Sequence, residues 1–504
     1  MAESFSSTIS TTAAEAPFIL SLDIGTSSVR ALLFDRHARH IEGTLVRATY
    51  PLRTATDGTA ETDADAVLNA LCHCLDTLTA QHAHLLKHVA AVGACTLAAT
   101  IVGLDEHQRP LTPLFIYADT RPAADVETLR QTLPEQETFQ RTGCPFHTAY
   151  FPARLLWLRR TAPHLAARVR TWATIDAYLM ARFFGELRVS LSNASWLGIL
   201  NRHTLTWDTP LLAALDLAPH ALPTLTDADN PLHGLREPWA QRWPHLRSVP
   251  WLPPIGDGAA ANIGSGCTSP AHVALTVGTS SALRFMTTTP PETLPWGLWC
   301  YRVTRRHALI GGALSEGGNI LDWARRTFAL NSADVQSILE TRPADGHGLT
   351  ILPFWAGERS PGWRADARAT IHGLTLAHTP ADIVQAILEA IAYRWAAIFD
   401  RCAPFLAHNA SVIGSGGALQ HLPAWAAIAA DVLERPVGLP HPIETSARGV
   451  ALLALDTLGA LTLDAAPPLP LARRYHPRPE QSERYRQARQ RQYRLDEQLH
   501  ARVV

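Results

Sequence analysis

Several features that would assign this chain to a special class are absent or scarce. Its 504 residues include 44 basic and 45 acidic side chains, so the formal net charge is only −1. Such a balance does not indicate nucleic acid or an anionic membrane surface as a partner. Charged and polar side chains interrupt each long apolar stretch, as they do in residues 381–406, so the sequence predicts no membrane-spanning helix.

Cysteine is also scarce, and the number and spacing of the cysteines argue against a Cys-x-x-Cys site and against a disulfide framework. The chain has seven cysteines and no Cys-x-x-Cys pair, and an odd number argues against a complete disulfide framework. We therefore expect a reducing, cytoplasmic environment. Residues 1–17 lack both the basic start and the apolar block of a targeting signal, and we expect them to form a disordered tail.

The composition that remains is that of a globular enzyme, with 47% apolar and 18% charged residues. The length suggests three domains or two large ones. Proline and tryptophan are concentrated in residues 222–254, which we take as a boundary. The predicted domains are residues 18–254 and 255–475, followed by an Arg-rich surface helix over 476–504.

A short turn motif occurs once in each half of the chain. Gly25-Thr26-Ser27-Ser28 lies between two apolar runs, and Gly278-Thr279-Ser280-Ser281 repeats the pattern 253 positions later. Each copy predicts a β-hairpin whose turn presents backbone N–H groups and hydroxyls, which suits an anion. Ordinary hairpin chemistry would explain either copy alone. The duplication at half-length favours a pair of turns that hold the phosphates of a nucleotide from two sides.

Two Gly-rich strand ends in the second half add to this prediction. They are residues 311–318 and 413–419, and their glycines would let the backbone approach a flat ligand such as a purine. A tight strand-to-helix turn is the alternative explanation for each.

Two aspartates are placed where phosphate chemistry would need them. Asp23 immediately precedes the first turn and could organise Mg²⁺, although a turn-capping role fits as well. Asp257 stands between Gly256 and Gly258 at the predicted start of an Ala-rich helix. A helix N-terminus favours the ionised carboxylate that a general base requires, but an ordinary N-cap has the same pattern. A further apolar strand, residues 114–118, delivers Asp119 and Arg121 to its end, where α/β proteins bind ligands.

Taken together, these motifs resemble the FGGY family of carbohydrate kinases from about residue 18 to 461. The resemblance rests on residues 23–30, 117–121, 256–258, 277–280, 357–361, 373–374 and 416–417, on Glu389 and on residues 430–432. It implies an α/β fold of two duplicated ribonuclease-H-like domains, as in actin and hexokinase, with a central cleft. It also implies ATP and Mg²⁺ as cofactors, and it leaves a homodimer open as the assembly.

The resemblance also implies individual roles. Asp257 corresponds to the base that accepts the proton of a sugar hydroxyl, and Asp23 to the residue that organises Mg²⁺. The expected ATP contacts are Gly25, Thr26, Ser27, Arg30, Gly278, Thr279, Gly318, Gly416 and Gly417.

Departures from the family pattern bear on the substrate. Leu97-Ala98-Ala99 replaces the polar residues that xylulokinases and glycerol kinases carry there, whereas residues 142–157 and 357–363 look most like gluconokinase members. We therefore expect phosphorylation of D-gluconate to 6-phosphogluconate, with xylulose or another pentulose or polyol as the alternative. A non-catalytic protein, switched by ATP or sensing sugar, is the alternative of another class. The expected substrate contacts are Asp119, Arg121, His147, Arg154 and Asp257. Arg121, His147, Arg154 and Arg359 are the candidate cations for a sugar acid, although each could serve an internal ion pair instead.

Overall fold

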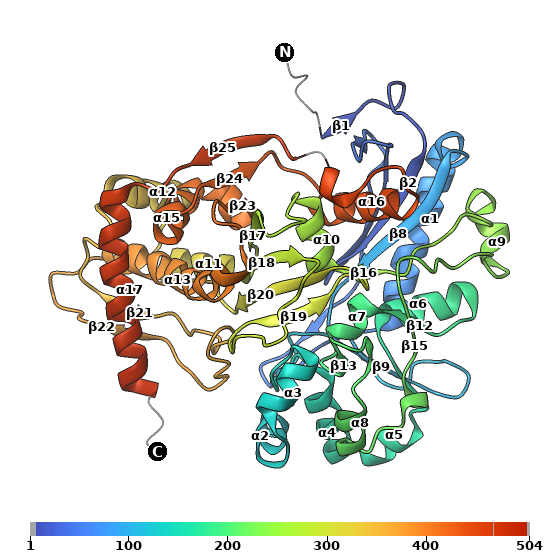
Figure 1. Cartoon of the computed structure of the whole chain (residues 1–504), viewed down its shortest axis with the longest axis horizontal. Coiled ribbons are helices and arrows are strands. Elements are labelled where there is room, and N and C mark those ends of the chain that lie inside the picture. Colours follow the sequence, from blue (N-terminus) through green and yellow to red (C-terminus); the bar gives the residue numbers. More distant parts are fainter. Residues whose placement is uncertain (1–6, 467, 501–504) are drawn as a thin grey trace.

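Each half of the chain is built on one seven-stranded sheet, and the two sheets lie side by side across the middle of the molecule (Figure 1). The computed structural model describes residues 7–466 and 468–500. The first sheet has the order β1-β4-β3-β2-β8-β16, with β5 also paired to β3. Its strands are β1 (Thr8–Ile9), β2 (Phe18–Ile24), β3 (Ser28–Phe34), β4 (His40–Ile41), β5 (Val46–Thr49), β8 (Val89–Thr96) and β16 (Ile255–Gly256).

The second sheet repeats this arrangement with the order β19-β20-β18-β17-β23-β24-β25. Its strands are β17 (His272–Val277), β18 (Ser281–Thr287), β19 (Trp299–Arg302), β20 (Ala308–Leu314), β23 (Ser411–Ser415), β24 (Val437–Pro440) and β25 (Leu471–Tyr475). In each sheet an antiparallel hairpin is continued by parallel strands: β2 pairs with β3 and then β8, and β17 pairs with β18 and then β23. The predicted duplication of strand, turn and strand is therefore confirmed.

Helices cover both sheets. The long helix α1 buries mainly one face, whereas α13 is buried on all sides from Val384 to Ala396. The helices are α1 (Ala64–Leu86), α2 (Ala123–Thr132), α3 (Glu135–Thr142), α4 (Phe151–Thr161), α5 (Pro163–Arg168), α6 (Ile175–Phe184), α7 (Leu191–Ser195), α8 (Thr209–Ala214), α9 (Trp239–Arg242), α10 (Asp257–Gly264), α11 (Gly318–Thr327), α12 (Ser332–Thr341), α13 (Pro380–Cys402), α14 (Gly417–His421), α15 (Pro423–Leu433), α16 (Thr445–Thr457) and α17 (Pro479–His500).

Short strands complete the periphery in sheets of two or three strands. They are β6 (Arg53–Thr54), β7 (Ala60–Thr62), β9 (Val102–Leu104), β10 (Leu114–Phe115), β11 (Thr171–Ala173), β12 (Arg188–Ser190), β13 (Leu200–Asn201), β14 (Thr206–Trp207), β15 (Thr224–Thr226), β21 (Thr350–Leu352) and β22 (Thr370–His372). Within residues 7–466 and 468–500, no helix combines the length and the apolar character that a membrane crossing would need.

Helices α10 and α16 join the two halves. They come after the predicted boundary at residue 254, yet α16 packs on β2 and β8 of the first sheet and crosses α10 at close range. The crossing is made by glycines: a Cβ on Gly264 would lie 1.7 Å from the Thr445 carbonyl oxygen, and one on Gly449 would lie 1.8 Å from that of Ala260. No side chain fits between these backbones, so the glycines fix the position of α10 and of Asp257 at its start.

Gly449→Ala is expected to force α10 and α16 apart. Because the new methyl group would collide with backbone rather than with a flexible side chain, we expect a loss of about 3 kcal/mol of stability. We also expect kcat to fall, because α10 begins at Asp257. Thermal unfolding and turnover measure the two effects. Thr457→Ala, at the other end of α16, is the matched control, and wild-type values for Gly449→Ala would contradict the packing argument.

The N-terminal segment differs from the prediction. Thr8–Ile9 forms β1 and pairs in parallel with β4, and the Arg36 N–H donates to the Glu15 carbonyl oxygen. This order comes from backbone hydrogen bonds at a sheet edge, which composition does not reveal. The prediction of a disordered tail is therefore wrong for residues 7–17, and residues 1–6 lie outside the described residues.

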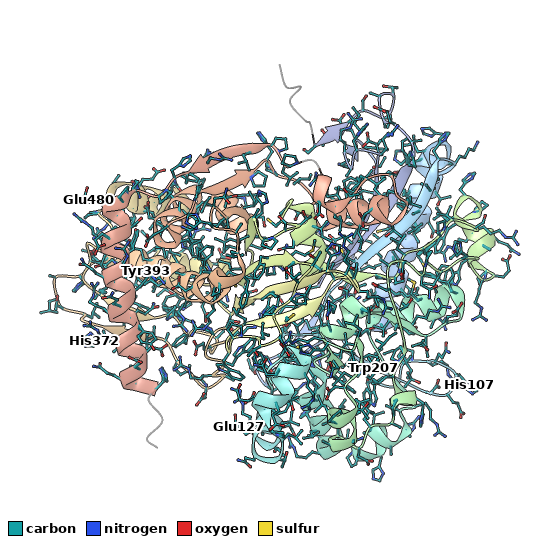
Figure 2. The ribbon with its side chains drawn as sticks, in the orientation of Figure 1. His107, Glu127, Trp207, His372, Tyr393 and Glu480 are labelled. Carbon is teal, nitrogen blue, oxygen red and sulfur yellow. The ribbon has the colours of Figure 1, made fainter. Side chains whose placement is uncertain are left out.

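The C-terminal helix forms as predicted but is only half exposed. α17 buries Tyr485, Ala488 and Gln492 and packs against α13, α15 and β21. Figure 2 labels Tyr393 on α13 and Glu480 at the start of α17. The exposed face of α17 carries the arginines that make this end of the sequence Arg-rich. The predicted residues 501–504 lie outside the described part of the chain.

Candidate active site

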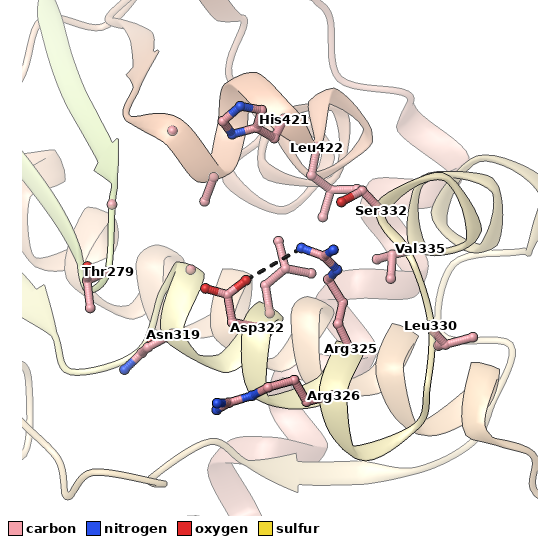
Figure 3. A pocket seen from close by; sticks show the side chains of 15 residues that line it. Thr279, Asn319, Asp322, Arg325, Arg326, Leu330, Ser332, Val335, His421 and Leu422 are labelled. Atoms are coloured by element: carbon pink, nitrogen blue, oxygen red, sulfur yellow. Dashed lines mark ion pairs between the residues drawn. The ribbon is translucent and has the colours of Figure 1, made fainter.

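A large cavity lies where the Gly-rich strand ends of the second sheet meet α11 and α14. Its volume is about 970 Å³. Figure 3 shows Thr279 and Asn319 at one side of it and His421 and Leu422 across from them, with an ion pair between Asp322 and Arg325. The lining includes the predicted nucleotide residues Gly278, Thr279, Gly318 and Gly417, together with Asn319, Leu321, Asp322, Arg325, Arg326, Leu330, Ser332, Val335, Ala418, His421 and Leu422.

Two of the predicted glycines are required by close backbone contacts. The Gly318 N–H donates to the Gly278 carbonyl oxygen at 2.7 Å, and a Cβ on Gly318 would lie 2.8 Å from the same oxygen. Gly416 has φ = +93°, and a Cβ there would lie 2.4 Å from the Val277 carbonyl oxygen. Gly416 packs against the backbone of Val277 at the end of β17, whereas Gly417 lines the cavity itself. The combination of glycine backbone, apolar side chains and arginines suits a nucleotide.

A second cavity, of about 290 Å³, lies between the two sheets. Thr26 of the first turn and Ser280 of the second both line it, and so does Asp257. The two predicted phosphate turns therefore do reach one site. The remaining predicted turn residues support this geometry: the Gly25 N–H donates to the Ser28 carbonyl oxygen and the Gly278 N–H to that of Ser280, while Ser27 is exposed beside them.

Asp257 is the first residue of α10 and follows directly on β16. Its Oδ1 accepts a 2.8 Å hydrogen bond from the Gly258 N–H. Burial and, next in size, the negative charge of Asp23 together raise the pKa of Asp257 to about 6, against the opposing effects of the Gly258 N–H and Arg284. A carboxylate with such a pKa is ionised at neutral pH and more basic than an ordinary aspartate, which suits a general base.

Asp23 is the second-last residue of β2, close to the first turn, and is 3% exposed. Arg30 Nη1 donates to its Oδ2 at 2.7 Å, and the Cys95 thiol contacts its Oδ1 at 3.4 Å. Arg30 also approaches Glu444, which precedes α16, at 3.5 Å. Of the predicted site residues, Asp23 and Arg30 thus form a pair that joins the first turn to the helix from the second half.

The effect of Asp23 on Asp257 gives a prediction for the pH profile. An active base must be ionised, so kcat/KM is expected to rise with pH until Asp257 has titrated near pH 6. Asp23→Asn removes the repelling charge, lowers the pKa of Asp257 and moves this acid limb to lower pH. Profiles of kcat/KM from about pH 5 to 8 test the shift. Glu444→Gln, which removes the other partner of Arg30, is the control, and an unmoved limb in Asp23→Asn would contradict the coupling.

Aromatic side chains form one wall of the smaller cavity. Trp196 stacks on Tyr301 with ring centroids 3.7 Å apart, Trp299 stacks on the same ring at 4.4 Å, and the hydroxyls of Tyr150 and Tyr301 are 2.6 Å apart. These four residues and Arg284 escaped prediction. The four aromatic residues left little signal in the sequence, because they come from three separate segments. Arg284 lies three residues after the second turn motif.

The structure does not bring Asp119 and Arg121 to the cavity wall. Arg121 donates to Asp119 and to Glu61 and lies 4.5 Å above the ring of Trp157. Its charge is therefore neutralised by two carboxylates of its own domain. The expected substrate contacts at these two positions give way to the alternative of an internal ion pair.

Arg154 and His147 do not offer a free positive charge to the cavity either. The buried guanidinium of Arg154 donates to the carbonyl oxygens of Ala99, Ile116 and Thr148 at 2.6–3.2 Å, so it supports the backbone of the wall and does not line the cavity. His147 lines the neighbouring cavity of about 660 Å³, but burial and then the charge of Arg359 lower its pKa to about 3. It is a neutral side chain at physiological pH.

Arg359 is the candidate cation that the structure leaves available. It lines both the 290 Å³ and the 660 Å³ cavity. Among the residues that the structure describes, none forms a hydrogen bond or ion pair with its guanidinium. Arg284 lines the smaller cavity too, with Nη2 donating to Thr276 Oγ1 at 2.8 Å. A Cβ on Gly258 would lie 2.5 Å from Arg284 Nη1, so this guanidinium sits beside Asp257.

One cluster outside the cavities has the composition of a metal site. Asp345, His347 and Glu389 bring their ligand atoms within 4.8 Å of one another. Glu389 already accepts hydrogen bonds from Gln385, Tyr393 and Tyr485, and Asp345 is paired with Arg491. The cluster is a saturated hydrogen-bond network that ties α13 to α17.

Comparison with known proteins agrees with this arrangement. Residues 18–264 match the N-terminal domain of the FGGY family of carbohydrate kinases, and residues 273–457 match its C-terminal domain. Among curated relatives, the gluconokinase of Bacillus subtilis (strain 168) is 26% identical over 456 residues, covering 88% of each chain. The glycerol kinase of Aromatoleum aromaticum is 30% identical over 454 residues, covering 87% of this chain and 89% of that one.

Two solved structures share the fold over nearly the whole chain. The gluconate kinase of Lactobacillus acidophilus superposes with a TM-score of 0.88 at 24% identity, covering 96% of this chain and 98% of that one. A ligand-bound xylulose kinase from the same organism gives the same TM-score and identity, with 96% and 99% coverage. The fold and site thus define a two-domain sugar phosphotransferase of the actin and hexokinase type, as predicted. The chain belongs to the FGGY family of carbohydrate kinases, and its phosphoryl donor is ATP.

Proposed function

We propose that this enzyme phosphorylates a sugar acid, with D-gluconate as the substrate and 6-phosphogluconate as the product. The observation that carries this proposal is Arg359. It is a guanidinium at a sugar-sized cavity, and within the described residues it has no carboxylate partner. A bound carboxylate would give it one, and charge-assisted bidentate pairing is the strongest contact that such a side chain makes.

The other candidate cations support this choice by elimination. Arg121 is neutralised by Asp119 and Glu61, and the donors of Arg154 point at backbone carbonyls. His147 is uncharged and lies close enough to Arg359 for that charge to depress its pKa. The gluconokinase relatives agree with a sugar-acid substrate.

Arg284 and Arg359 both line the cavity, and we assign them to different parts of the substrate. Arg284 lies beside Asp257, so the reacting hydroxyl at C6 belongs at that end. Arg359 lines both this cavity and the larger neighbouring one and would hold the C1 carboxylate. The stacked Trp196, Tyr301 and Trp299 would exclude water along the carbon chain between them.

The proposed reaction is direct transfer of the γ-phosphoryl group. Asp257 accepts the proton of the C6 hydroxyl, the hydroxyl oxygen forms a bond to the γ-phosphorus, and the bond to the β-phosphate oxygen breaks to release ADP. Thr26 and Ser280 would donate hydrogen bonds to the phosphates from the two turns. Arg284 would stabilise the negative charge that develops on the transferred group.

The residues present also fit Mg²⁺. The ion favours oxygen ligands and one or two carboxylates, and Asp23 and Asp257 lie near enough for the charge of one to raise the pKa of the other. Asp23 would hold the ion. When bound, Mg²⁺ would neutralise charge on the ATP phosphates, and it would reduce the repulsion between the two aspartates.

Xylulose is the second candidate substrate, because the xylulose kinase structure superposes as well as the gluconate kinase structure does. A coupled assay of ADP release, with gluconate, xylulose, ribulose, glycerol and a control without sugar, tests the proposal. We expect the largest stimulation with gluconate. Stimulation by xylulose alone would mean that xylulose, and not gluconate, is the substrate. ADP release equal to the control for all sugars would contradict a kinase that acts on these compounds.

A further inference from the structure

The segment that carries Arg359 is held by a compact network of charges. Glu358, next to Arg359 in the chain, is 2% exposed. Its carboxylate accepts hydrogen bonds from Arg364 Nε at 2.5 Å, from Arg394 Nη2, and from the Gly362 N–H at 3.2 Å. The Glu358 N–H donates to the Arg364 carbonyl oxygen at 2.8 Å, which closes residues 358–364 into a loop around this carboxylate.

The same two arginines bind a second carboxylate, and this one comes from the C-terminal helix. Arg364 Nη2 donates to Asp496 Oδ1 at 2.8 Å, and Arg394 Nη1 donates to Asp496 Oδ2 at 3.2 Å. Both guanidinium groups also lie over the ring of Phe354, at 5.4 and 5.1 Å from its centroid. Two arginines and two carboxylates thus form a neutral, mostly buried square that joins residues 358–364, α13 and α17.

The other supports of Arg359 come from the second sheet. The Ser360 N–H donates to the Ala313 carbonyl oxygen at 3.0 Å, and the Ala313 N–H donates to Ser360 Oγ at 3.2 Å. These bonds fix the residue that follows Arg359, while the network fixes the residue that precedes it. The Arg359 carbonyl oxygen accepts from the Trp363 N–H at 2.6 Å, whereas its guanidinium makes no hydrogen bond or ion pair within the described residues and lines the two cavities.

We propose that Asp496 of α17 is a positioning residue for substrate binding, which acts through Arg364, Arg394 and Glu358 to hold Arg359 toward the sugar acid. The proposal rests on the role of Arg359 given above. It assigns the C-terminal helix to the substrate site, although α17 itself touches neither cavity between the sheets.

The physical reason is the excess positive charge that would remain if the Asp496 carboxylate were removed. Asp496→Asn removes one of the two carboxylates from a mostly buried set of two arginines. Arg394 and Arg364 then share the single charge of Glu358, one on each of its oxygens, and the segment that carries Arg359 is held less firmly. Binding of a carboxylate at Arg359 depends on this geometry, whereas ATP binds at the cavity beside α11.

A double-mutant cycle between Asp496→Asn and Arg359→Gln tests the proposal, with KM for gluconate, KM for ATP and kcat as readouts. Asp496→Asn alone is expected to raise KM for gluconate about tenfold, with KM for ATP unchanged within about twofold. In the Arg359→Gln background, Asp496→Asn is expected to have no further effect on KM for gluconate, because both changes act on one contact.

Each other outcome overturns a definite part of the account. If Arg359→Gln raises KM for gluconate but Asp496→Asn adds its own effect in that background, the positioning role is wrong and the substrate contact stands. If Arg359→Gln leaves KM for gluconate unchanged, the substrate contact is wrong and this proposal falls with it. Equal rises in KM for gluconate and ATP would indicate a general loss of structure.

Two further variants guard against misfolding and against effects of α17 in general. Arg394→Lys keeps the charge but has one nitrogen in place of the two, Nη1 and Nη2, that reach Asp496 and Glu358, so it is expected to reproduce the effect on gluconate. Glu483→Gln removes an exposed ion pair with Arg486 on the same helix and is expected to change no kinetic constant. Wild-type kinetics in Arg394→Lys together with Asp496→Asn would contradict the proposal.

Discussion

Asp257→Asn is expected to lower kcat by about 10³-fold, because the amide cannot accept the proton of the attacking hydroxyl. Asp257 does not line the cavity beside α11, to which we assign the nucleotide, so binding of ADP or ATP should persist. Thermal stability is expected to rise slightly, by about 1 kcal/mol, because the substitution removes a buried charge that Asp23 repels. Loss of turnover together with a gain in stability would distinguish a general base, whose buried charge is unfavourable, from a residue whose role is only to cap α10.

Steady-state turnover, nucleotide titration calorimetry and thermal unfolding give the three readouts for Asp257→Asn. The matched control is Asp229→Asn, an exposed aspartate of the first half. Turnover within about tenfold of wild type would remove Asp257 as the general base, since such a base contributes at least that much.

Arg359→Gln is expected to lower kcat/KM for gluconate by about 100-fold, because it removes the charge that pairs with the substrate carboxylate. The loss should appear mainly in KM, and KM for ATP should not change. A neutral polyol would lose little, since it never used the charge. Arg306→Gln, an exposed arginine between β19 and β20, is the matched control.

The outcome for Arg359→Gln separates two accounts of the cavity. Equal losses with gluconate and a neutral polyol would mean that Arg359 shapes the wall or stabilises transferred phosphate. No loss with either would return the role of sugar-acid contact to another cation, for which Arg284 is the remaining guanidinium of the smaller cavity.

The main chain of this protein could be predicted far better than its side-chain partnerships. The two Gly-Thr-Ser turns, the Gly-rich strand ends and the helix starting at Asp257 are local patterns, and each formed as expected. Asp119, Arg121 and Arg154 could not be assigned in this way. Arg121 pairs with the distant Glu61 as well as with its neighbour Asp119, and Arg154 donates to carbonyl oxygens such as that of Ala99, which is also far away in the sequence. Whether a cation is neutralised depends on such long-range contacts.

The same reason explains why α17 was underestimated. Its composition is dominated by exposed arginines, and the residues that matter for its docking, Tyr485, Gln492 and Asp496, are spread along its buried face. The N-terminal strand β1 was missed because two residues at a sheet edge leave no periodic pattern. In each case the deciding interaction was tertiary, and the local sequence carried no sign of it.

The most direct test of the central claim compares gluconate with D-glucitol, which has the same six-carbon chain but a hydroxymethyl group in place of the carboxylate. We expect kcat/KM for gluconate to exceed that for glucitol by about 100-fold in the wild-type enzyme, and Arg359→Gln to abolish most of this difference. Equal kcat/KM values for the two compounds in the wild-type enzyme, or a preference for glucitol, would contradict a site built around a sugar-acid carboxylate.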